Sequence, residues 1–105
     1  MGQFAVHKNK NPKTCKQYPF LLDVQSDLLS DLQTRVIVPL APQSVAEGAA
    51  QKRLTPVVHI HGESYLLVTP RLAGIETSSI GAAVADLGRY RNDIIAALDF
   101  LVTGI

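Results

Sequence analysis

Short apolar runs separated by turn-forming residues extend over most of the chain. The runs are rich in Val, Ile, Leu and Thr, are roughly five to eight residues long and are divided by Pro, Gly, Asn or Ser, which is typical of consecutive β-strands. We expect strands at residues 3–8, 18–24, 34–38, 56–60, 64–69 and 75–80. Pro39 and Pro70 should end two of them, because proline donates no hydrogen bond to a strand ladder, and Gly81 should end the last.

The segment His61-Gly62-Glu63 lies between two of the apolar runs. A glycine in so short a connection favours a β-hairpin. Residues 41–53 show no clear period, so we expect an irregular connection there with one weak helical turn. The run Val36-Ile37-Val38 is apolar on both faces, as a central or interface strand would be.

The last twenty residues change to a helical period. Apolar residues and one arginine recur at intervals of three and four, which predicts one buried stripe on an amphipathic helix. The stripe comprises Leu87, Arg91, Ile94, Ile95, Leu98, Leu101 and Val102. The helix should begin near Asp86 or Gly88 and end before Gly104. Phe100 lies off this stripe, so we expect it to face solvent or a partner.

Length and charge narrow the class of protein. A chain of 105 residues, 47% of them apolar, predicts one folded domain over residues 1–105. A formal net charge of +1 gives weak whole-chain attraction to nucleic acid or membrane. The single cysteine, Cys15, cannot form an intrachain disulfide. With no signal or membrane-spanning pattern, the expectation is a soluble, cytoplasmic protein with no membrane partner.

Motifs for nucleotide binding, esterase chemistry and zinc proteolysis are absent from the sequence, which argues against an enzyme. His59 and His61 could share a metal only if His7 or Glu63 completed the site. Two partly buried histidines on a hairpin are the commoner arrangement. We therefore expect no metal and no cofactor.

The strongest local charge asymmetry lies near the start of the chain. Lys8, Lys10, Lys13 and Lys16 stand within 22 residues that contain no acidic group. Such a cluster is most often a solvated loop, but it can attract a phosphate backbone or an acidic partner segment.

Three aspartates follow the lysine cluster at intervals of four. Asp23 and Asp27 could pass for a pair of catalytic carboxylates, with Asp31 four residues further on. In a strand that leads into a turn the two need not face each other. Capping of a short turn by Ser26 or Asp27 is the preferred role.

The chain end offers a binding feature. Gly104 and Ile105 place a carboxylate within about one turn of a helix C-terminus, where the macrodipole is already negative, so this end favours a cationic group such as an arginine. A frayed tail is the alternative. Phe100 is correspondingly either an anchor of a recognition patch or a lone exposed residue.

Several segments resemble the CcdB family of toxins, in order and with similar spacing from Gln3 to Ile105. They are Asp23-Val24-Gln25-Ser26-Asp27, Val38-Pro39-Leu40, Pro56-Val57-Val58-His59-Ile60, Val84-Ala85-Asp86-Leu87, Asn92-Asp93-Ile94 and Gly104-Ile105. The resemblance implies a mostly β homodimer with an SH3-like β-barrel and a C-terminal α-helix. It also implies a toxin of a type II toxin–antitoxin system that binds the DNA gyrase A subunit and traps the cleaved-DNA complex.

The family's antitoxin, CcdA, neutralises the toxin with a disordered C-terminal segment, and the two together repress their operon. The resemblance therefore implies a CcdA-like antitoxin as partner, and operator DNA only as a target of the antitoxin complex. In this setting Lys8, Lys10, Lys13 and Lys16 are candidates for contacting the acidic antitoxin segment or the operator.

The family's gyrase-contacting positions carry over where the motifs match. They are Ser26, Leu28, Asn92, Asp99, Val102, Thr103, Gly104 and Ile105, and Phe100 is added from the same side of the helix. Thr103 stands where a well-known family member has tryptophan. The change removes a surface on which a target arginine could stack, a contact of roughly 0.5–2 kcal/mol.

Two other functions stay open. An endoribonuclease of the MazF or Kid type would share the barrel, and Arg35, Asp23 and His59 could be enlisted for its acid–base chemistry. A degenerate family member that binds antitoxin but no longer harms gyrase is also compatible with Thr103.

Overall fold

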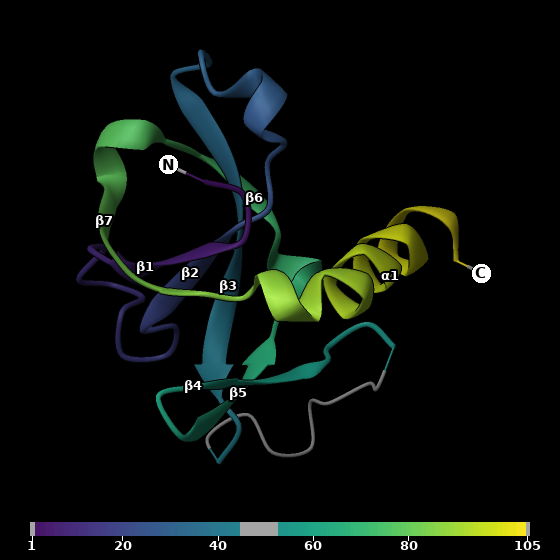
Figure 1. The fold of residues 1–105 in the computed structure, drawn as a ribbon. Helices are drawn as coiled ribbons and strands as arrows, with labels where there is room; N and C mark the ends of the chain where they lie inside the picture. Colours follow the sequence, from purple (N-terminus) through teal and green to yellow (C-terminus); the bar gives the residue numbers. More distant parts are fainter. Residues whose placement is uncertain (1, 45–52, 105) are drawn as a thin grey trace.

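One curled antiparallel sheet and a helix at the chain end make up the fold (Figure 1). The computed structural model describes residues 2–44 and 53–104. Within them the strands are β1 (Ala5–Asn9), β2 (Phe20–Asp23), β3 (Thr34–Pro42), β4 (Val57–Ile60), β5 (Glu63–Leu67), β6 (Ala73–Glu76) and β7 (Ile80–Asp86). Short 3₁₀ turns are η1 (Asp27–Leu29), η2 (Thr69–Arg71), η3 (Thr77–Ser79) and η4 (Gly88–Tyr90), and α1 (Arg91–Thr103) follows.

Neighbouring strands in the sheet run in the order β4-β5-β3-β2-β1-β7, and β6 pairs separately with β3. β3 is long enough to pair with β6 along its first half and with β5 along its second half. This arrangement confirms the predicted fold class, mostly β with a barrel-like sheet and a C-terminal helix. It also confirms the central position expected for Val36-Ile37-Val38. Within the described residues, no helix has both the length and the apolar character needed to cross a membrane.

The main core lies between one face of the sheet and α1. Alternate residues of the strands point into it, because successive side chains of a strand face opposite ways. Its buried members are Phe4, Val6, Leu22, Val24, Val38, Leu40, Val58, Ile60, Tyr65, Leu67, Leu87 and Ile94. Burial of each large aliphatic side chain contributes about 1.5–3 kcal/mol, so this cluster fixes the helix against the sheet.

A second, smaller cluster covers the opposite face of β2 and β3. Leu21, Ile37 and Ile80 are buried there, with Ile75 packed against them. The segment from β6 to β7 supplies Ile75 and Ile80 and so covers part of this face. The sheet is therefore covered on both sides at its centre.

The first strands confirm the sequence prediction, with one correction. β3 does not end at Pro39 but continues to Pro42. On one side of β3, Pro39 pairs with Leu21 of β2. On the other side, β3 pairs with β6 as far as Ile37 and with β5 from Leu40 onward, so Pro39 lies between the two partners. The missing N–H falls where β3 changes partner, so proline removes no ladder bond there, and its carbonyl accepts from Val68 N at 2.9 Å.

The hairpin prediction is confirmed. Ile60 pairs with Glu63 across a two-residue turn. His61 has φ 51° and Gly62 has φ 83°, the paired positive values of a type I′ turn. Of the connection predicted for residues 41–53, positions 45–52 lie outside the described residues.

The expected strand at 75–80 is wrong in its extent. The chain forms β6, turns through η3 and then forms β7, which pairs with β1 through Val6↔Ala85 and His7↔Ala83. Gly81 is the second residue of β7 rather than the end of a strand, and it lies so close to β1 that a Cβ there would be 2.7 Å from the Lys8 carbonyl oxygen. Alanines have low strand propensity, so β7 gives little sequence signal.

The helix ends as predicted and begins slightly later than predicted. Gly104 adopts the left-handed conformation, φ 73°, and its N–H donates to the Phe100 carbonyl at 2.9 Å. Asp86 is the last residue of β7 and Gly88 begins η4, and the Asp86 carboxylate accepts from Gly88 N at 2.7 Å. Tyr90 anchors the helix start to β4, since its hydroxyl accepts from His59 N at 3.2 Å.

The predicted helix stripe needs a correction at its C-terminal end. Ile94 and Ala97 are buried, whereas Leu101 is 38% and Val102 is 83% exposed. The helix projects beyond the sheet at its C-terminal end, so the described residues cover Leu101 only in part and Val102 hardly at all (Figure 1). Arg91 is also exposed, although it was placed on the stripe.

Candidate partner-binding site

The last turn of α1 is an exposed end that projects from the sheet. Leu101, Val102, Thr103 and Gly104 are all exposed, as is Asp99 one turn earlier. The Thr103 hydroxyl donates to the Asp99 carbonyl at 2.7 Å. Asn92, at the start of the helix, is exposed as well, and Ile105 lies outside the described residues. The structure therefore places most of the predicted helix residues at the surface, where a partner can reach them.

Phe100, which was expected to face solvent or a partner, is half-buried. The Arg53 guanidinium lies 4.3 Å from the centre of its ring, a cation–π contact. Arg53 also lines a shallow pocket of about 230 Å³ with Pro56, Asp93 and Ala96. Arg53 thus covers a face of Phe100 beside the helix, and the sequence pattern of the helix alone could not reveal this neighbour.

The turn η1 carries the other predicted contact residues. Ser26 caps it by accepting from Leu28 N at 3.2 Å, which confirms the capping role. Leu28 is 95% exposed, and Leu29 and Leu32 are each 51% exposed. Asp27 accepts from Gln3 N at 2.8 Å, which ties the turn to the segment just before β1. Sequence reasoning singled out Leu28 but missed Leu29 and Leu32, whose apolar side chains continue the same exposed surface.

The turn and the helix end do not meet within one chain. Figure 1 shows η1 near the start of β3, at the top of the view, and the C-terminal end of α1 projecting to the right, well below it. A single copy therefore presents two separate apolar surfaces.

The four lysines of the basic cluster are all exposed. Most of them lie in the loop between β1 and β2, which is held together by hydrogen bonds from Asn9. Its side-chain Nδ2 donates to Thr14 Oγ1 at 3.0 Å and to the Tyr18 carbonyl at 2.8 Å. Cys15 is half-buried in the same loop.

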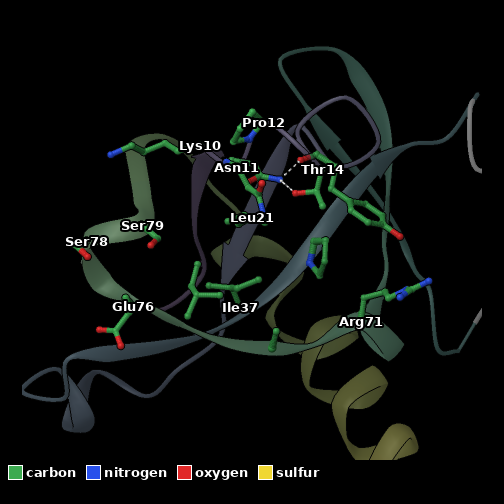
Figure 2. Close-up of a pocket in the computed structure, with 15 residues that line it drawn as sticks. Lys10, Asn11, Pro12, Thr14, Leu21, Ile37, Arg71, Glu76, Ser78 and Ser79 are labelled. Carbon is green, nitrogen blue, oxygen red and sulfur yellow. Dashed lines mark hydrogen bonds between the residues drawn. The ribbon is translucent and has the colours of Figure 1, made fainter.

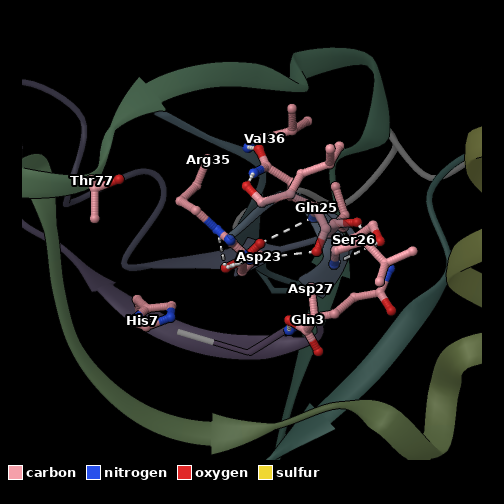
Figure 3. A network of polar contacts seen from close by, with 12 residues as sticks. Gln3, His7, Asp23, Gln25, Ser26, Asp27, Arg35, Val36 and Thr77 are labelled. Atoms are coloured by element: carbon pink, nitrogen blue, oxygen red, sulfur yellow. Dashed lines mark hydrogen bonds and ion pairs between the residues drawn. The ribbon is translucent and has the colours of Figure 1, made fainter. Parts of the chain in front are cut away.

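The residues considered for nuclease chemistry are divided between the interior and the surface. Arg35 and Asp23 form a buried ion pair with Nη2–Oδ2 2.7 Å, and their side chains are 2% and 0% exposed (Figure 3). Gln25 closes the network, since its N–H donates to Asp23 Oδ1 and its Oε1 accepts from Val36 N. His59 is exposed on β4, with Nδ1 3.1 Å from Ser64 Oγ. A buried carboxylate that is already paired with an arginine cannot reach an RNA substrate. Asp23 and Arg35 therefore have a structural role.

The histidines do not form a metal site. Within residues 2–44 and 53–104, no cluster of three or more His, Cys, Asp or Glu could hold a metal ion. His59 and His61 are exposed rather than partly buried as expected. His7 is buried on a different strand, where its Nδ1 donates to the Gly81 carbonyl at 3.0 Å.

Comparison with known protein families gives a match that covers nearly the whole chain. The family model of the CcdB protein matches residues 3–104. The matched range includes the capped turn, the basic loop and the exposed helix end. CcdB proteins are gyrase-poisoning toxins of toxin–antitoxin systems. With a match of this extent, the chain belongs to the CcdB family.

Proposed function

We propose that this protein binds the A subunit of DNA gyrase through the end of α1 and traps the cleaved-DNA complex. The observation that carries this proposal is the exposed last turn of the helix, where Val102 is 83% exposed. An apolar side chain so exposed at a projecting end suits insertion into a partner's cavity. In this mechanism the toxin breaks no bond, and the DNA break is made by the target enzyme.

The electrostatics of the helix end favour a cationic target group. The last turn of α1 contains no basic residue, and Asp99 lies one turn from its end. The carbonyl groups at a helix C-terminus carry a partial negative charge. An arginine of the target would complement this charge and donate hydrogen bonds to the exposed carbonyl groups.

A homodimer would bring the separate apolar surfaces into one assembly. Besides Val102 and Leu28, Leu72 is 39% and Leu101 is 38% exposed. A two-fold axis would cover part of this surface and present each helix end twice, which suits a target with two identical subunits. We place Ser26, Leu28, Asn92, Asp99, Phe100, Val102, Thr103, Gly104 and Ile105 on the gyrase-contacting surface of that dimer.

Neutralisation by a CcdA-like antitoxin is the second part of the proposal. The exposed lysines of the basic loop would attract an acidic antitoxin segment, or operator DNA once the antitoxin is bound. Replacing Lys8, Lys10, Lys13 and Lys16 together should weaken antitoxin binding and reduce its salt dependence. Unchanged affinity and unchanged salt slope would remove the basic loop from this role.

The decisive experiment is a cleavage assay with gyrase, DNA and ATP. The folded protein should cause linear DNA to accumulate, and a variant lacking residues 103–105 should not, although it keeps its fold and its dimer. Val102→Ser should weaken capture of the isolated gyrase A fragment more than Val57→Ser, which changes an exposed valine on β4. No linear DNA at saturating protein would reject gyrase poisoning, and RNA cleavage by the pure protein would favour the nuclease instead.

A further inference from the structure

A pocket of about 760 Å³ lies on the sheet face that carries the second cluster, away from the main core (Figure 2). Apolar side chains of three strands contribute to its lining, namely Leu21 of β2, Ile37 and Pro39 of β3, and Ala73 and Ile75 of β6. Part of the loop between β1 and β2 lines one side, and Ser78 and Ser79 of η3 line another. A pocket of this size can accept one or two large side chains of a bound peptide.

The pocket is already shaped in the free protein. The part of the pocket wall formed by the loop is fixed by the two hydrogen bonds of the Asn9 side-chain amide. Two backbone hydrogen bonds within the loop add to these, from Cys15 N to the Asn11 carbonyl at 2.9 Å and from Tyr18 N to the Thr14 carbonyl at 2.8 Å. Walls that are held in place before binding reduce the entropy cost of seating a ligand.

The charges at the pocket favour an anionic ligand. Lys10 and Arg71 line it and are exposed, and Figure 2 shows them on opposite sides. Glu76 is the acidic residue in the lining. Among the described residues, neither Lys10 nor Arg71 forms a salt bridge. The pocket therefore combines apolar strand residues with two available cations.

From this combination we propose that the pocket seats an apolar side chain of an acidic peptide segment from a partner protein, with carboxylates of that segment reaching Lys10 and Arg71. The inference rests on the antitoxin binding proposed above and specifies where such a segment docks. A nucleic-acid backbone would satisfy the cations but would leave the apolar residues of the pocket without a partner. A peptide can contact both the cations and the apolar residues, so it fits the pocket better than a nucleic acid does.

Two synthetic peptides of about twelve residues serve as probes in a fluorescence anisotropy titration. Both alternate acidic residues with a second residue, which is Leu in one peptide and Ser in the other. The Leu peptide should bind the full-length protein at least about tenfold more tightly than the Ser peptide, because only its side chains can fill the pocket. Equal affinity of the two peptides, or no binding of either, would overturn the proposal.

Charge-reversal variants locate the site. Lys10→Glu with Arg71→Glu should weaken the Leu peptide about tenfold or more, since both cations line the pocket. The matched control, Arg89→Glu with Arg91→Glu, reverses two exposed charges at and just before the start of α1 that do not line the pocket, and should cost less than about threefold. Equal losses in the two double variants would show general attraction to positive charge and would contradict the proposed site.

A filling variant tests the apolar part independently of charge. Ala73 is exposed on β6 and lines the pocket, so Ala73→Trp should reduce the affinity for the Leu peptide to that for the Ser peptide. An unchanged circular dichroism spectrum and melting temperature would show that the variant is folded. Undiminished Leu-peptide binding by the folded variant, or displacement of the peptide by duplex DNA, would refute the proposal. Gyrase is absent from these titrations, so their failure is separate from any failure of gyrase poisoning.

Discussion

The guanidinium of Arg35 reaches one carboxylate oxygen of Asp23 with two of its nitrogens, Nε at 2.8 Å and Nη2 at 2.7 Å. Both side chains are almost completely buried, with Asp23 at the end of β2 and Arg35 near the start of β3. Gln25 adds its carbonyl, 3.4 Å from Arg35 Nη2, so each charge has several polar partners (Figure 3). The pair lies beside the second apolar cluster and joins the ends of two neighbouring strands.

Removing one member of this pair should destabilise the fold strongly. Asp23→Ala leaves the Arg35 charge buried without its partner, and such a change costs about 3–5 kcal/mol of unfolding free energy. Urea denaturation followed by circular dichroism measures the loss. Asp31→Ala is the matched control, because Asp31 is exposed, and it should change stability by less than about 0.5 kcal/mol. Comparable losses in the two variants would show that the buried pair does not hold the strands together.

Stability should fall at alkaline pH because of Tyr65. Its hydroxyl donates to Glu63 Oε2 at 3.1 Å, and burial, followed by this hydrogen bond and the Glu63 charge, raises the pKa of Tyr65 above 10.0. The folded protein therefore holds the phenolic proton more tightly than the unfolded chain does. The resulting stability is fully present below the unfolded pKa of about 10 and is lost as the pH rises toward the folded pKa.

The Tyr65 contribution can be isolated with two variants. In denaturant titrations between neutral and alkaline pH, Tyr65→Phe should show a smaller loss of unfolding free energy than the wild-type protein. Glu63→Gln should show an intermediate loss, because it removes the charge and leaves burial in place. A wild-type slope in Tyr65→Phe would assign the alkaline sensitivity to another group.

Gly81 should tolerate no side chain. A Cβ at this position would lie 2.7 Å from the Lys8 carbonyl oxygen, and that backbone atom cannot move without disturbing the pairing of β1 and β7. Gly81→Ala should therefore cost about 1–3 kcal/mol in thermal or urea unfolding. Gly74→Ala is the comparison, since a Cβ on Gly74 of β6 meets nothing within 4 Å. Should Gly74→Ala prove as damaging as Gly81→Ala, close packing of β7 on β1 would not be the cause.

The sequence predicted best the elements whose signals are local. The hairpin at His61-Gly62 and the helix end at Gly104 depend on positive φ angles, which glycine favours in short segments. β7 was missed because its support comes from β1 at the other end of the chain, as in the pair Val6↔Ala85. An alanine-rich strand becomes recognisable only when its distant partner is known.

The candidate site was predictable only in part, for a similar reason. The exposed helix end and the Ser26 cap followed from local pattern and family resemblance. The contact of Arg53 with Phe100 joins two distant segments, and the pocket between Lys10 and Arg71 joins several strands and a loop. Helical periodicity also could not show that α1 projects beyond the sheet, which is why Val102 is exposed rather than buried.

Position 103 offers the sharpest test of how this chain meets its target. Thr103 is exposed at the last helical residue, where the resemblance places tryptophan in a well-known family member. Thr103→Trp would supply an aromatic face for a target arginine, a gain of roughly 0.5–2 kcal/mol, or about two- to thirtyfold in affinity for the gyrase A fragment. Thr103→Leu adds apolar bulk without a π-face and should gain less. If Thr103→Trp binds the gyrase A fragment no more tightly than Thr103→Leu does, no arginine stacks at this position. The attraction of the helix end for a cation would then rest on its carbonyl groups alone.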